Sequence, residues 1–444
     1  MDNMRVVILG GNPAGMSAAS RIKRKSPDTE VIVLEKTDEV SYGACGLPYY
    51  VAGLNEDLDL IRIRKAPEFE SAGIRVRTGC EATGIDYEEK YVRAVSEEEG
   101  EITEAYDKLI IATGASPKFL NVEGMELMNI YSLKTLKDAE ELKRGLLGGQ
   151  KNVVIIGGGY IGLELAEACL LKKVKSVRII EAADRILSVF DAEFGEGAVR
   201  ELERHGVSVH TKECVRSFEG EAGRVKSVTT DKGSYEADLV IMSVGVSPNT
   251  AFAGDIEKLP NGAIVTDKAM RTAKKDVYAA GDCAAVWHRL LDKPSYIALG
   301  TNANKQGRLA GDSVLGRPVC FDRALGTAML RCMDLELAKT GLSEEEARRA
   351  GISYKTKLVE ARSHARYYPA PCPVTIKLVY HAKSRRILGA QIMGEREAAW
   401  RIDIFACAID REMTTEELGY LDLGYAPMFA GVWDAVQIAA NAAK

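Results

Sequence analysis

The sequence predicts an α/β protein in which one strand–turn–helix–strand unit occurs twice, followed by an α+β segment. The first copy has a buried apolar strand at residues 5–9, a glycine-rich turn and a helical pattern through residue 25. The second copy repeats this order from residue 153. In addition, DKLIIATGASP at 107–117 matches DLVIMSVGVSP at 238–248, each with an aspartate seven residues before a glycine. Two related halves with parallel sheets are therefore expected.

The turn of the first copy reads Gly10-Gly11-Asn12-Pro13-Ala14-Gly15, and the strand after its helix ends at Glu35. Free N–H groups and the positive dipole end at a helix N-terminus can meet a pyrophosphate, and a side chain in the turn would obstruct that approach. Asn12 stands where the middle glycine is expected, and asparagine tolerates unusual backbone angles better than most residues. The glutamate can accept hydrogen bonds from a ribose diol, which FAD and NAD both offer.

The turn of the second copy fits the dinucleotide pattern fully, with Gly157, Gly159 and Gly162, and Glu181 follows 19 residues after the last of these. Two such turns, each followed by a strand that ends in glutamate, predict two dinucleotide sites rather than two ordinary glycine turns. Glu181 would repel a 2′-phosphate, and the next two residues are alanines, so NADH is favoured over NADPH. Arg178 and Arg185 lie near in sequence and weaken this inference.

A third apolar strand ends at Gly281-Asp282 before a turn of small residues. The aspartate could hydrogen-bond a ribityl hydroxyl or the edge of a pyrophosphate. Alternatively, it caps the next helix, which is compatible with the same role.

One cysteine, Cys45 in SYGACGLPYY, lies ten residues past Glu35 and has Tyr50 where a disulfide partner is usual. Gly43, Gly46 and Pro48 indicate a specialised turn around it rather than a regular core strand. A single cysteine beside a dinucleotide site predicts a mixed disulfide or an oxidised sulfur formed with a small substrate. The alternative is a cysteine of the buried core.

Composition excludes several classes of protein. The 444 residues carry a net charge of -5, which argues against a nucleic-acid partner, and the apolar runs are only strand-length, which argues against membrane spans. The first strand begins so near Met1 that no leader is expected, and a cytoplasmic location follows as the default. Nine irregularly spaced cysteines form no CxxC pair, and His205 and His210 lack a surrounding ligand cluster, so no metal is expected.

Four segments together resemble successive signatures of the pyridine nucleotide-disulfide oxidoreductase family: LIIATGASP, GGGYIGLELA, IMSVGVSPN and VYAAGDCA. The resemblance covers essentially the whole chain. The single cysteine narrows it to the branch of coenzyme A-disulfide reductases, NADH oxidases, NADH peroxidases and NADH-dependent sulfur reductases. It implies an FAD-binding domain at 1–116 and 247–320, an NAD-binding domain at 117–246, and a C-terminal domain at 321–444 that makes a homodimer.

The resemblance also assigns residues to each cofactor. Tyr160 is similar to the side chain that covers the flavin until the nicotinamide displaces it. The expected FAD-binding residues are Gly10, Asn12, Gly15, Glu35, Lys36, Thr113, Gly114 and Asp282. The expected NAD-binding residues are Gly157, Gly159, Tyr160, Gly162, Glu181 and Gly245.

Residues that this chain lacks distinguish between the members of the branch. Peroxidases and water-forming oxidases place a histidine in the first glycine turn, where this chain has Pro13. Dithiol reductases need a second cysteine and a late His-Pro pair, and no histidine follows His381. A peroxidase or water-forming oxidase and a dithiol reductase are therefore both disfavoured.

Three tyrosines, Tyr367, Tyr368 and Tyr425, resemble the positions at which the partner subunit of a coenzyme A-disulfide reductase reaches the redox cysteine. A phenol can donate a proton to a thiolate in place of histidine. The tyrosines could instead pack an interface. A coenzyme A-like substrate is expected to meet Arg21, Lys23, Arg24 and Ser41, whose alternative is a solvated basic helix end. Ala44 replaces the usual asparagine, and the segment after Tyr425 is bulky, so the pocket is expected to differ.

The expected reaction passes electrons from NADH through FAD to Cys45, whose thiolate attacks a disulfide or polysulfide sulfur with Tyr425 as proton donor. Coenzyme A disulfide, a coenzyme A persulfide and polysulfide all fit these steps. One alternative is an NADH oxidase that reduces oxygen and releases peroxide. Another is a redox carrier or sensor with a protein partner.

The C-terminal segment carries no cofactor signature. Strand patterns at 374–380 and 386–393 and helical patterns at 398–409 and 429–443 predict an antiparallel sheet with helices on one face.

Overall fold

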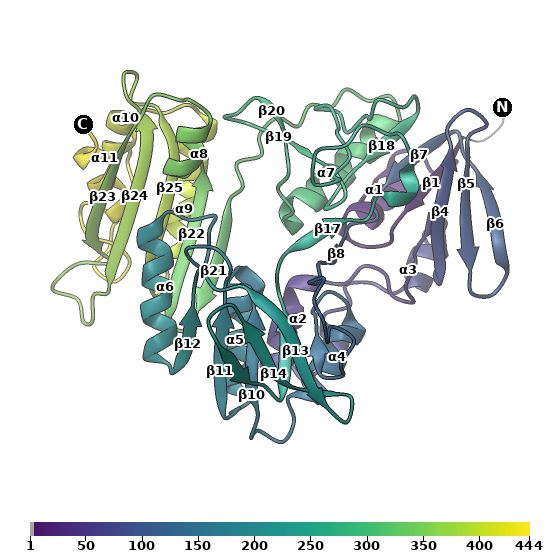
Figure 1. The fold of residues 1–444 in the computed structure, drawn as a ribbon. Helices are drawn as coiled ribbons and strands as arrows, with labels where there is room; N and C mark the ends of the chain where they lie inside the picture. Colours follow the sequence, from purple (N-terminus) through teal and green to yellow (C-terminus); the bar gives the residue numbers. More distant parts are fainter. Residues whose placement is uncertain (1–3) are drawn as a thin grey trace.

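The computed structural model describes residues 4–444, which form three sheet-centred parts (Figure 1). Residues 1–3, and with them the expectation that no leader precedes the first strand, lie outside the described residues. The first sheet is parallel in the order β18-β7-β1-β2-β3, with bounds Arg5–Leu9 (β1), Glu30–Leu34 (β2), Ile74–Arg77 (β3), Lys108–Ile111 (β7) and Val277–Ala279 (β18). β18 comes from residues beyond the second half, so this unit is assembled from two stretches of chain.

Two helices cover one face of the first sheet: α1 (Pro13–Lys25) and α7 (Gly300–Val314). They approach so closely that a Cβ on Gly307 would lie 2.1 Å from the backbone oxygen of Ala14. An antiparallel sheet stands beside this unit, formed by Cys80–Asp86 (β4), Tyr91–Ser96 (β5) and Gly100–Ala105 (β6).

The second unit repeats the plan with the sheet order β12-β11-β10-β16-β9. Its strands are Ile130–Tyr131 (β9), Asn152–Ile156 (β10), Ser176–Ile180 (β11), Val207–His210 (β12) and Leu239–Met242 (β16). Its helices are Leu136–Gly145 (α4), Tyr160–Leu171 (α5) and Ala192–Arg204 (α6). A small antiparallel sheet again accompanies it, made of Val215–Glu221 (β13), Arg224–Thr230 (β14) and Ser234–Glu236 (β15).

The chain crosses between the two units through a two-stranded antiparallel ribbon, Ala115–Pro117 (β8) against Val246–Pro248 (β17). The proposed domain boundaries at 116/117 and 246/247 fall inside this ribbon. They stay a prediction about where the domains divide.

The C-terminal part is an antiparallel sheet in the order β21-β22-β25-β24-β23 (Figure 1). Its strands are Ala328–Cys332 (β21), Leu335–Gly341 (β22), Tyr354–Arg362 (β23), Pro373–His381 (β24) and Ile387–Glu395 (β25). Its helices are Glu344–Arg349 (α8), Ile402–Asp410 (α9), Thr415–Gly419 (α10) and Ala435–Ala442 (α11). The expected strands at 374–380 and 386–393 are present as β24 and β25.

The predicted helix at 429–443 is too long, because α11 begins only at Ala435. Asp434 caps it by accepting a hydrogen bond from the Val436 N–H at 2.9 Å, which fixes the start of the helix. The carbonyl of Phe429 accepts a hydrogen bond from Arg401 at 3.2 Å and stays outside any helix. The predicted helix at 398–409 begins as a 3-10 turn, Ala399–Arg401 (η4), and continues as α9.

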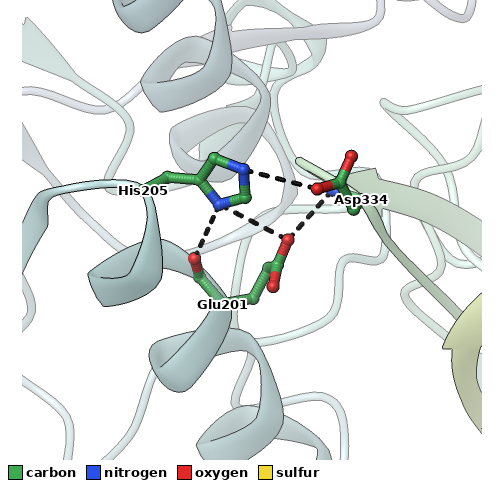
Figure 2. Close-up of side chains that lie close together, drawn as sticks. All are labelled: Glu201, His205 and Asp334. Carbon is green, nitrogen blue, oxygen red and sulfur yellow. Dashed lines mark hydrogen bonds and ion pairs between the residues drawn. The ribbon is translucent and has the colours of Figure 1, made fainter.

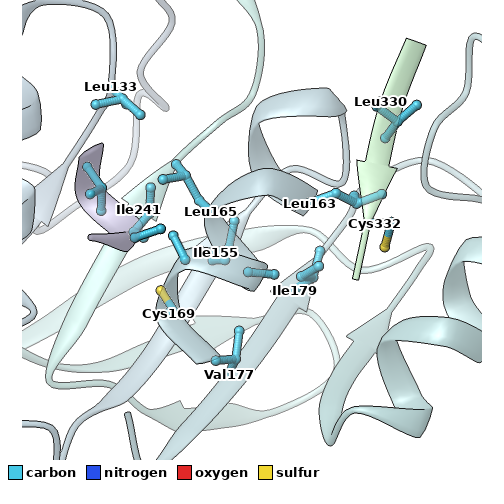
Figure 3. Packing of buried hydrophobic residues seen from close by; sticks show 14 of the residues in the cluster. Leu133, Ile155, Leu163, Leu165, Cys169, Val177, Ile179, Ile241, Leu330 and Cys332 are labelled. Atoms are coloured by element: carbon cyan, nitrogen blue, oxygen red, sulfur yellow. The ribbon is translucent and has the colours of Figure 1, made fainter. Parts of the chain in front are cut away.

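Helix α5 is the centre of the packing that joins the three parts (Figure 3). Leu163 and Leu165 are fully buried in one cluster with Ile155 and Ile179 of the second sheet. Further members are Leu330 and Cys332 of β21 and Leu47 and Val51 of the first unit. Because this helix is held from three sides, side chains at its N-terminal end are positioned rigidly relative to both nucleotide turns.

The remaining elements are short: Ala44–Gly46 (η1), Leu47–Ala52 (α2), Leu58–Leu60 (η2), Ala66–Glu70 (α3), Ala251–Ala253 (η3), Val286–His288 (β19) and Lys293–Ser295 (β20). Over residues 4–444, no helix combines the length and the apolar character that a bilayer crossing requires.

Candidate active site

The first glycine turn joins β1 to α1. Gly10 has a φ of +103°, and a Cβ on Gly15 would lie 1.8 Å from the Gly10 backbone oxygen, so both positions need glycine. The carboxylate of Glu35 accepts hydrogen bonds from the N–H groups of Gly11 at 2.6 Å and Thr37 at 2.8 Å. The acidic residue thus lies directly against the turn, as a ribose-binding residue must.

Asn12 caps α1 with an ordinary extended backbone (φ -108°, ψ -163°), so the tolerance of asparagine for unusual angles is not what places it there. Its side-chain oxygen instead accepts a hydrogen bond from the N–H of Tyr42 at 3.2 Å. Asn12 therefore ties the glycine turn to the segment that carries Cys45.

The second glycine turn has the same geometry. Gly157 has a φ of +104°, and a Cβ on Gly162 would lie 2.2 Å from the Gly157 oxygen. Glu181 accepts hydrogen bonds from the N–H groups of Gly158 and Ala183, both at 2.8 Å. A Cβ on Gly159 would meet no atom within 4 Å, so this glycine leaves open space at the N-terminus of α5.

Both turns open into one cleft of about 1830 Å³ between the two units. It brings together most of the residues expected to hold the two cofactors: Gly10, Asn12, Glu35, Lys36, Thr113, Gly114, Asp282, Gly157, Gly159, Tyr160, Glu181 and Gly245. Gly15 and Gly162 are not in the lining, because they lie one helical turn inside, where helix and strand cross. The volume exceeds that of a drug-sized pocket and suits a dinucleotide.

Cys45 lies in the same cleft, in the 3-10 turn η1 just before α2. All nine cysteines are free thiols. Tyr50, which stands where a disulfide partner of Cys45 is usual, makes a cation–π contact with the ammonium of Lys143, 3.8 Å from its ring centroid. In the chain alone the pKa of the Cys45 thiol is raised, first by burial and then by the charge of Glu164, while Lys134 lowers it. Stabilisation of a thiolate must therefore come from groups that counter these two effects.

Lys134 and Glu164 are cleft residues that the sequence analysis missed. The ammonium of Lys134 pairs with the carboxylate of Asp282 at 3.2 Å. Lys134 belongs to no motif and directly precedes a helix cap. Glu164 lies inside the signature GGGYIGLELA, but no role was expected for it there. Its spacing from Tyr160, one helical turn apart on α5, was a further available signal.

Tyr160 begins α5 and lies on the wall of the cleft. Its ring packs edge-on against Phe190 with centroids 6.2 Å apart, and burial raises the pKa of its phenol. The ring is thus held on one side while its other side borders the cleft.

A second cavity of about 660 Å³ lies beside the first, lined by Lys23, Arg24 and Ser41 as expected for substrate binding. Arg64 and Arg308 add two further guanidinium groups. Lys23 is partly engaged, because its ammonium donates to the backbone oxygens of Pro27 at 2.6 Å and Thr29 at 3.0 Å.

Arg21 is not part of this second cavity. Its guanidinium instead forms two hydrogen bonds with the carboxylate of Asp312 on α7, at 2.9 and 2.7 Å. The expectation that Arg21 binds substrate phosphate is therefore wrong for the conformation described, because its guanidinium already holds α1 and α7 together.

The two cavities adjoin each other. Pro13, Tyr42, Gly43 and Asn304 line both of them. The cations of the second cavity and the thiol of Cys45 therefore belong to neighbouring cavities that share one wall.

Tyr367, Tyr368 and Tyr425 do not line either cavity of the same chain. They lie on the C-terminal part, where the hydroxyls of Tyr367 and Tyr425 hydrogen-bond each other, an interaction that raises the pKa of Tyr425. The surrounding surface is unusually apolar, with exposed side chains at Tyr367, Tyr368, Trp400, Tyr420, Leu421, Tyr425, Met428, Phe429, Val432 and Trp433.

One cluster outside the cleft has ligand types that a metal ion could use: Glu201, His205 and Asp334 (Figure 2). Arg204 pairs with Glu201 at 2.9 Å and with Asp334 at 2.8 Å, so both carboxylates already have a cation from the chain. We assign the cluster to an ion-pair network that fastens α6 to the turn between β21 and β22.

Comparison with known proteins decides the family. Residues 4–307 match Pyridine nucleotide-disulphide oxidoreductase and residues 328–436 match its dimerisation domain. The chain belongs to the pyridine nucleotide-disulphide oxidoreductase family. The resemblance inferred from the sequence, the two nucleotide-binding halves and the C-terminal dimerisation domain are thereby confirmed. The family implies an oxidoreductase that uses FAD and NAD(P)H.

Individual relatives cover nearly the full chain. It is 37% identical to an NAD(P)H coenzyme A polysulfide/persulfide reductase of Pyrococcus horikoshii, over 100% of this chain and 99% of the relative. It is 34% identical to an NADH oxidase of Lactococcus lactis, over 99% and 100%. A solved NAD-dependent persulfide reductase from A. fulgidus superposes with a TM-score of 0.94 at 36% identity, covering 99% of this chain and 82% of that one.

Proposed function

We propose that the protein is an FAD-dependent NAD(P)H:disulfide oxidoreductase that reduces a small sulfur substrate on coenzyme A, through the single redox cysteine Cys45. The observation that carries the proposal is that the cationic cavity adjoins the large cleft of Cys45, with Tyr42 and Gly43 in the lining of both, which supports a substrate path between them. Coenzyme A has a phosphorylated head and a long arm that ends in sulfur, which fits both ends of this path. The name of the Pyrococcus horikoshii relative supports the same substrate class.

The residues present fit both cofactors. The missing Cβ at Gly159 leaves room for a pyrophosphate at the N-terminus of α5, and Gly10, Asn12 and Pro13 line the cleft at the N-terminus of α1. Glu35 and Glu181 offer carboxylate oxygens for ribose hydroxyls. Thr113, Gly114 and Asp282 complete the first site, and Tyr160 and Gly245 the second. When bound between the two halves, FAD would supply two-electron transfer from the nicotinamide to Cys45.

Cys45 carries the sulfur chemistry. Its thiolate attacks one sulfur of the substrate disulfide, a Cys45–substrate disulfide forms, and the other half leaves as a thiolate that takes a proton. Two electrons then cleave the mixed disulfide and restore the Cys45 thiolate. Overall, NADH, one proton and a disulfide yield NAD⁺ and two thiols, so each turnover consumes one proton from solvent.

The phosphates of the substrate are proposed to bind Lys23, Arg24, Arg64 and Arg308, with Ser41 at the neck of the path. Changing Arg24 and Arg308 together to glutamine should raise KM for a coenzyme A-linked substrate by about tenfold, because two charge-assisted contacts are lost. KM for a small uncharged disulfide should not change. Steady-state kinetics with both substrates would measure this.

Lys25→Gln is the matched control, because Lys25 lies on the same helix, carries the same charge and is outside the cavity. Equal KM changes for the two substrates in the double variant would contradict the assignment of this cavity.

NADH is proposed as the preferred reductant over NADPH. Glu181 presents its carboxylate at the second turn, and the guanidinium of Arg178 stacks on Tyr235 with its CZ 4.2 Å from the ring centroid, so it is occupied elsewhere. Glu181→Gln should lower the ratio of kcat/KM for NADH over NADPH by about tenfold, because a 2′-phosphate would no longer face a negative charge. Glu35→Gln, the equivalent change in the first half, should leave this ratio unaltered. An unaltered ratio in Glu181→Gln would refute the proposed origin of the preference.

A homodimer is proposed as the working form, with the apolar surface around Tyr425 as part of its interface. In that form Tyr367, Tyr368 and Tyr425 would approach Cys45 of the second copy and give a proton to the departing thiolate. The dimerisation-domain match and the distance of these tyrosines from both cavities of their own chain support this arrangement. A monomer in sedimentation velocity at working concentration would count against it. A cytoplasmic location stays a prediction.

The test of the function is anaerobic NADH consumption with coenzyme A disulfide, coenzyme A persulfide and polysulfide, beside an aerobic assay with oxygen alone. We expect at least one sulfur substrate to exceed oxygen in kcat/KM. Faster oxygen reduction would favour an NADH oxidase, the name of the Lactococcus lactis relative. Slow turnover with every acceptor, together with redox-dependent binding of a protein, would favour a carrier.

A further inference from the structure

Glu164 lines the same cleft as Cys45, and no other described residue is paired with its carboxylate. It lies on α5 one turn after Tyr160, and both side chains line the cleft that contains the thiol. Within residues 4–444 its carboxylate has no hydrogen bond or ion pair, although the side chain is half-buried. The next acid on this helix, Glu167, is paired with Arg331 at 2.7 Å. Glu164 and Glu167 therefore differ in whether a cation pairs with their carboxylate.

The charge on Glu164 acts on Cys45. After burial, it is the largest cause of the raised pKa of the thiol. Burial, followed by the charge of Glu167, raises the pKa of Glu164 itself to about 7. The carboxyl group thus changes its charge near neutral pH, next to a thiol that changes its charge during turnover.

The other titratable groups around Glu164 come from every element packed near it. The start of α2 contributes Tyr49, whose pKa Glu164 also raises. The segment before α4 contributes Lys134, and the turn after β18 contributes Asp282, and these two pair with each other. β21 contributes Arg331, which is held by Glu167. Lys134 is thus already paired, and Glu164 is left to respond to the charge on Cys45.

We propose that Glu164 is a proton-linked partner of Cys45: it binds a proton when Cys45 becomes a thiolate, and it returns to a carboxylate when Cys45 enters a disulfide. Two interacting charges change each other's proton affinity by the same amount, so the coupling works in both directions. The proton is taken from solvent when Cys45 becomes a thiolate and returns to solvent when Cys45 enters a disulfide, so Glu164 adds nothing to the one proton that each turnover consumes, and no bond other than the carboxyl O–H forms or breaks at Glu164. The inference rests on Cys45 being the redox thiol, as proposed above.

The first test measures the thiol rather than turnover. In FAD-loaded enzyme with reduced cysteines, the rate of Cys45 alkylation by iodoacetamide is followed peptide by peptide, so that the other cysteines do not interfere. At pH 8, Glu164→Gln should raise this rate about threefold, because loss of the nearby negative charge lowers the pKa of the thiol and a larger fraction of it is ionised. Glu167→Gln should leave it within error of the wild type. An unchanged rate in Glu164→Gln would overturn the proposal.

The second test needs no stable variant. An infrared difference spectrum of the wild-type holoenzyme, with NADH minus without, should gain the C=O stretch of a protonated carboxyl group. Cys45→Ser should lose that band, and so should Glu164→Gln if it folds. A wild-type spectrum without the band would contradict the proposal. Because neither test uses a sulfur substrate, a wrong substrate assignment would leave both results interpretable.

Discussion

Cys45→Ser should reduce the turnover of every disulfide and polysulfide substrate by at least about a thousandfold, because the thiol that the proposed mechanism requires is lost and the other two cleft cysteines, Cys80 and Cys214, have no part in it. Reduction of the flavin by NADH, which is the first half of the reaction, should still occur in this variant. The glycine turns, Glu35, Glu181 and Tyr160 do not depend on the thiol, so NADH should still bleach the flavin in anaerobic stopped-flow. Absorbance at the flavin band and thiol release, measured on the same samples, separate the two halves.

Cys407→Ser is the matched control, since Cys407 is also an exposed thiol but lies on α9 of the C-terminal part. It should behave as the wild type in both halves of the reaction. Turnover of disulfides by Cys45→Ser at the wild-type rate would exclude the mechanism, and loss of flavin reduction in the same variant would point to a structural role for Cys45.

Gly162→Ala should destabilise the second unit severely, because the new methyl group would lie 2.2 Å from the backbone oxygen of Gly157. Helix α5 cannot move away, since Leu163 and Leu165 on it are fully buried among residues of all three parts (Figure 3). We expect a loss of at least about 2 kcal/mol in the free energy of unfolding, as for an overpacked core. Chemical denaturation would measure it.

Gly159→Ala is the matched variant three residues away. Its methyl group would enter open space in the cleft, so the free energy of unfolding should change little. NADH should bind at least about tenfold more weakly, because the methyl group occupies the approach to the helix N-terminus. Equal stability of the two variants would show that the crossing at Gly162 is less tight than described.

The nucleotide turns were predictable because their chemistry is local. Gly10, Gly157 and their neighbours must adopt particular backbone angles or avoid a Cβ, and these demands leave glycines at fixed spacings. The two glutamates, Glu35 and Glu181, were predictable for the same reason, because each strand ends next to its own glycine turn. Glu35, for example, accepts a hydrogen bond from the N–H of Gly11. Requirements that act over a few residues leave a pattern that the sequence displays.

Features that depend on which way a side chain points were not predictable. Arg21 and Arg24 both lie in the basic end of α1, yet Arg21 binds Asp312, nearly 300 residues away in the chain, and Arg24 faces the cavity. Glu164 belongs to the segment GGGYIGLELA, but its relation to Cys45 arises only because α5 and the turn of Cys45 line the same cleft. The FAD-binding role of Asn12 stays a prediction, and its contact with Tyr42 replaces the backbone reason first given for it.

The most direct measurement of the central claim is to trap the intermediate on Cys45. Pre-reduced enzyme is mixed anaerobically with one equivalent of coenzyme A disulfide, quenched in acid within a turnover, digested and analysed by mass spectrometry. The account predicts coenzyme A in disulfide linkage on the Cys45 peptide, formed at a rate compatible with turnover and slowed in the Arg24 and Arg308 double variant. Turnover of the disulfide with no adduct on Cys45, or an adduct only on another cysteine, would contradict it.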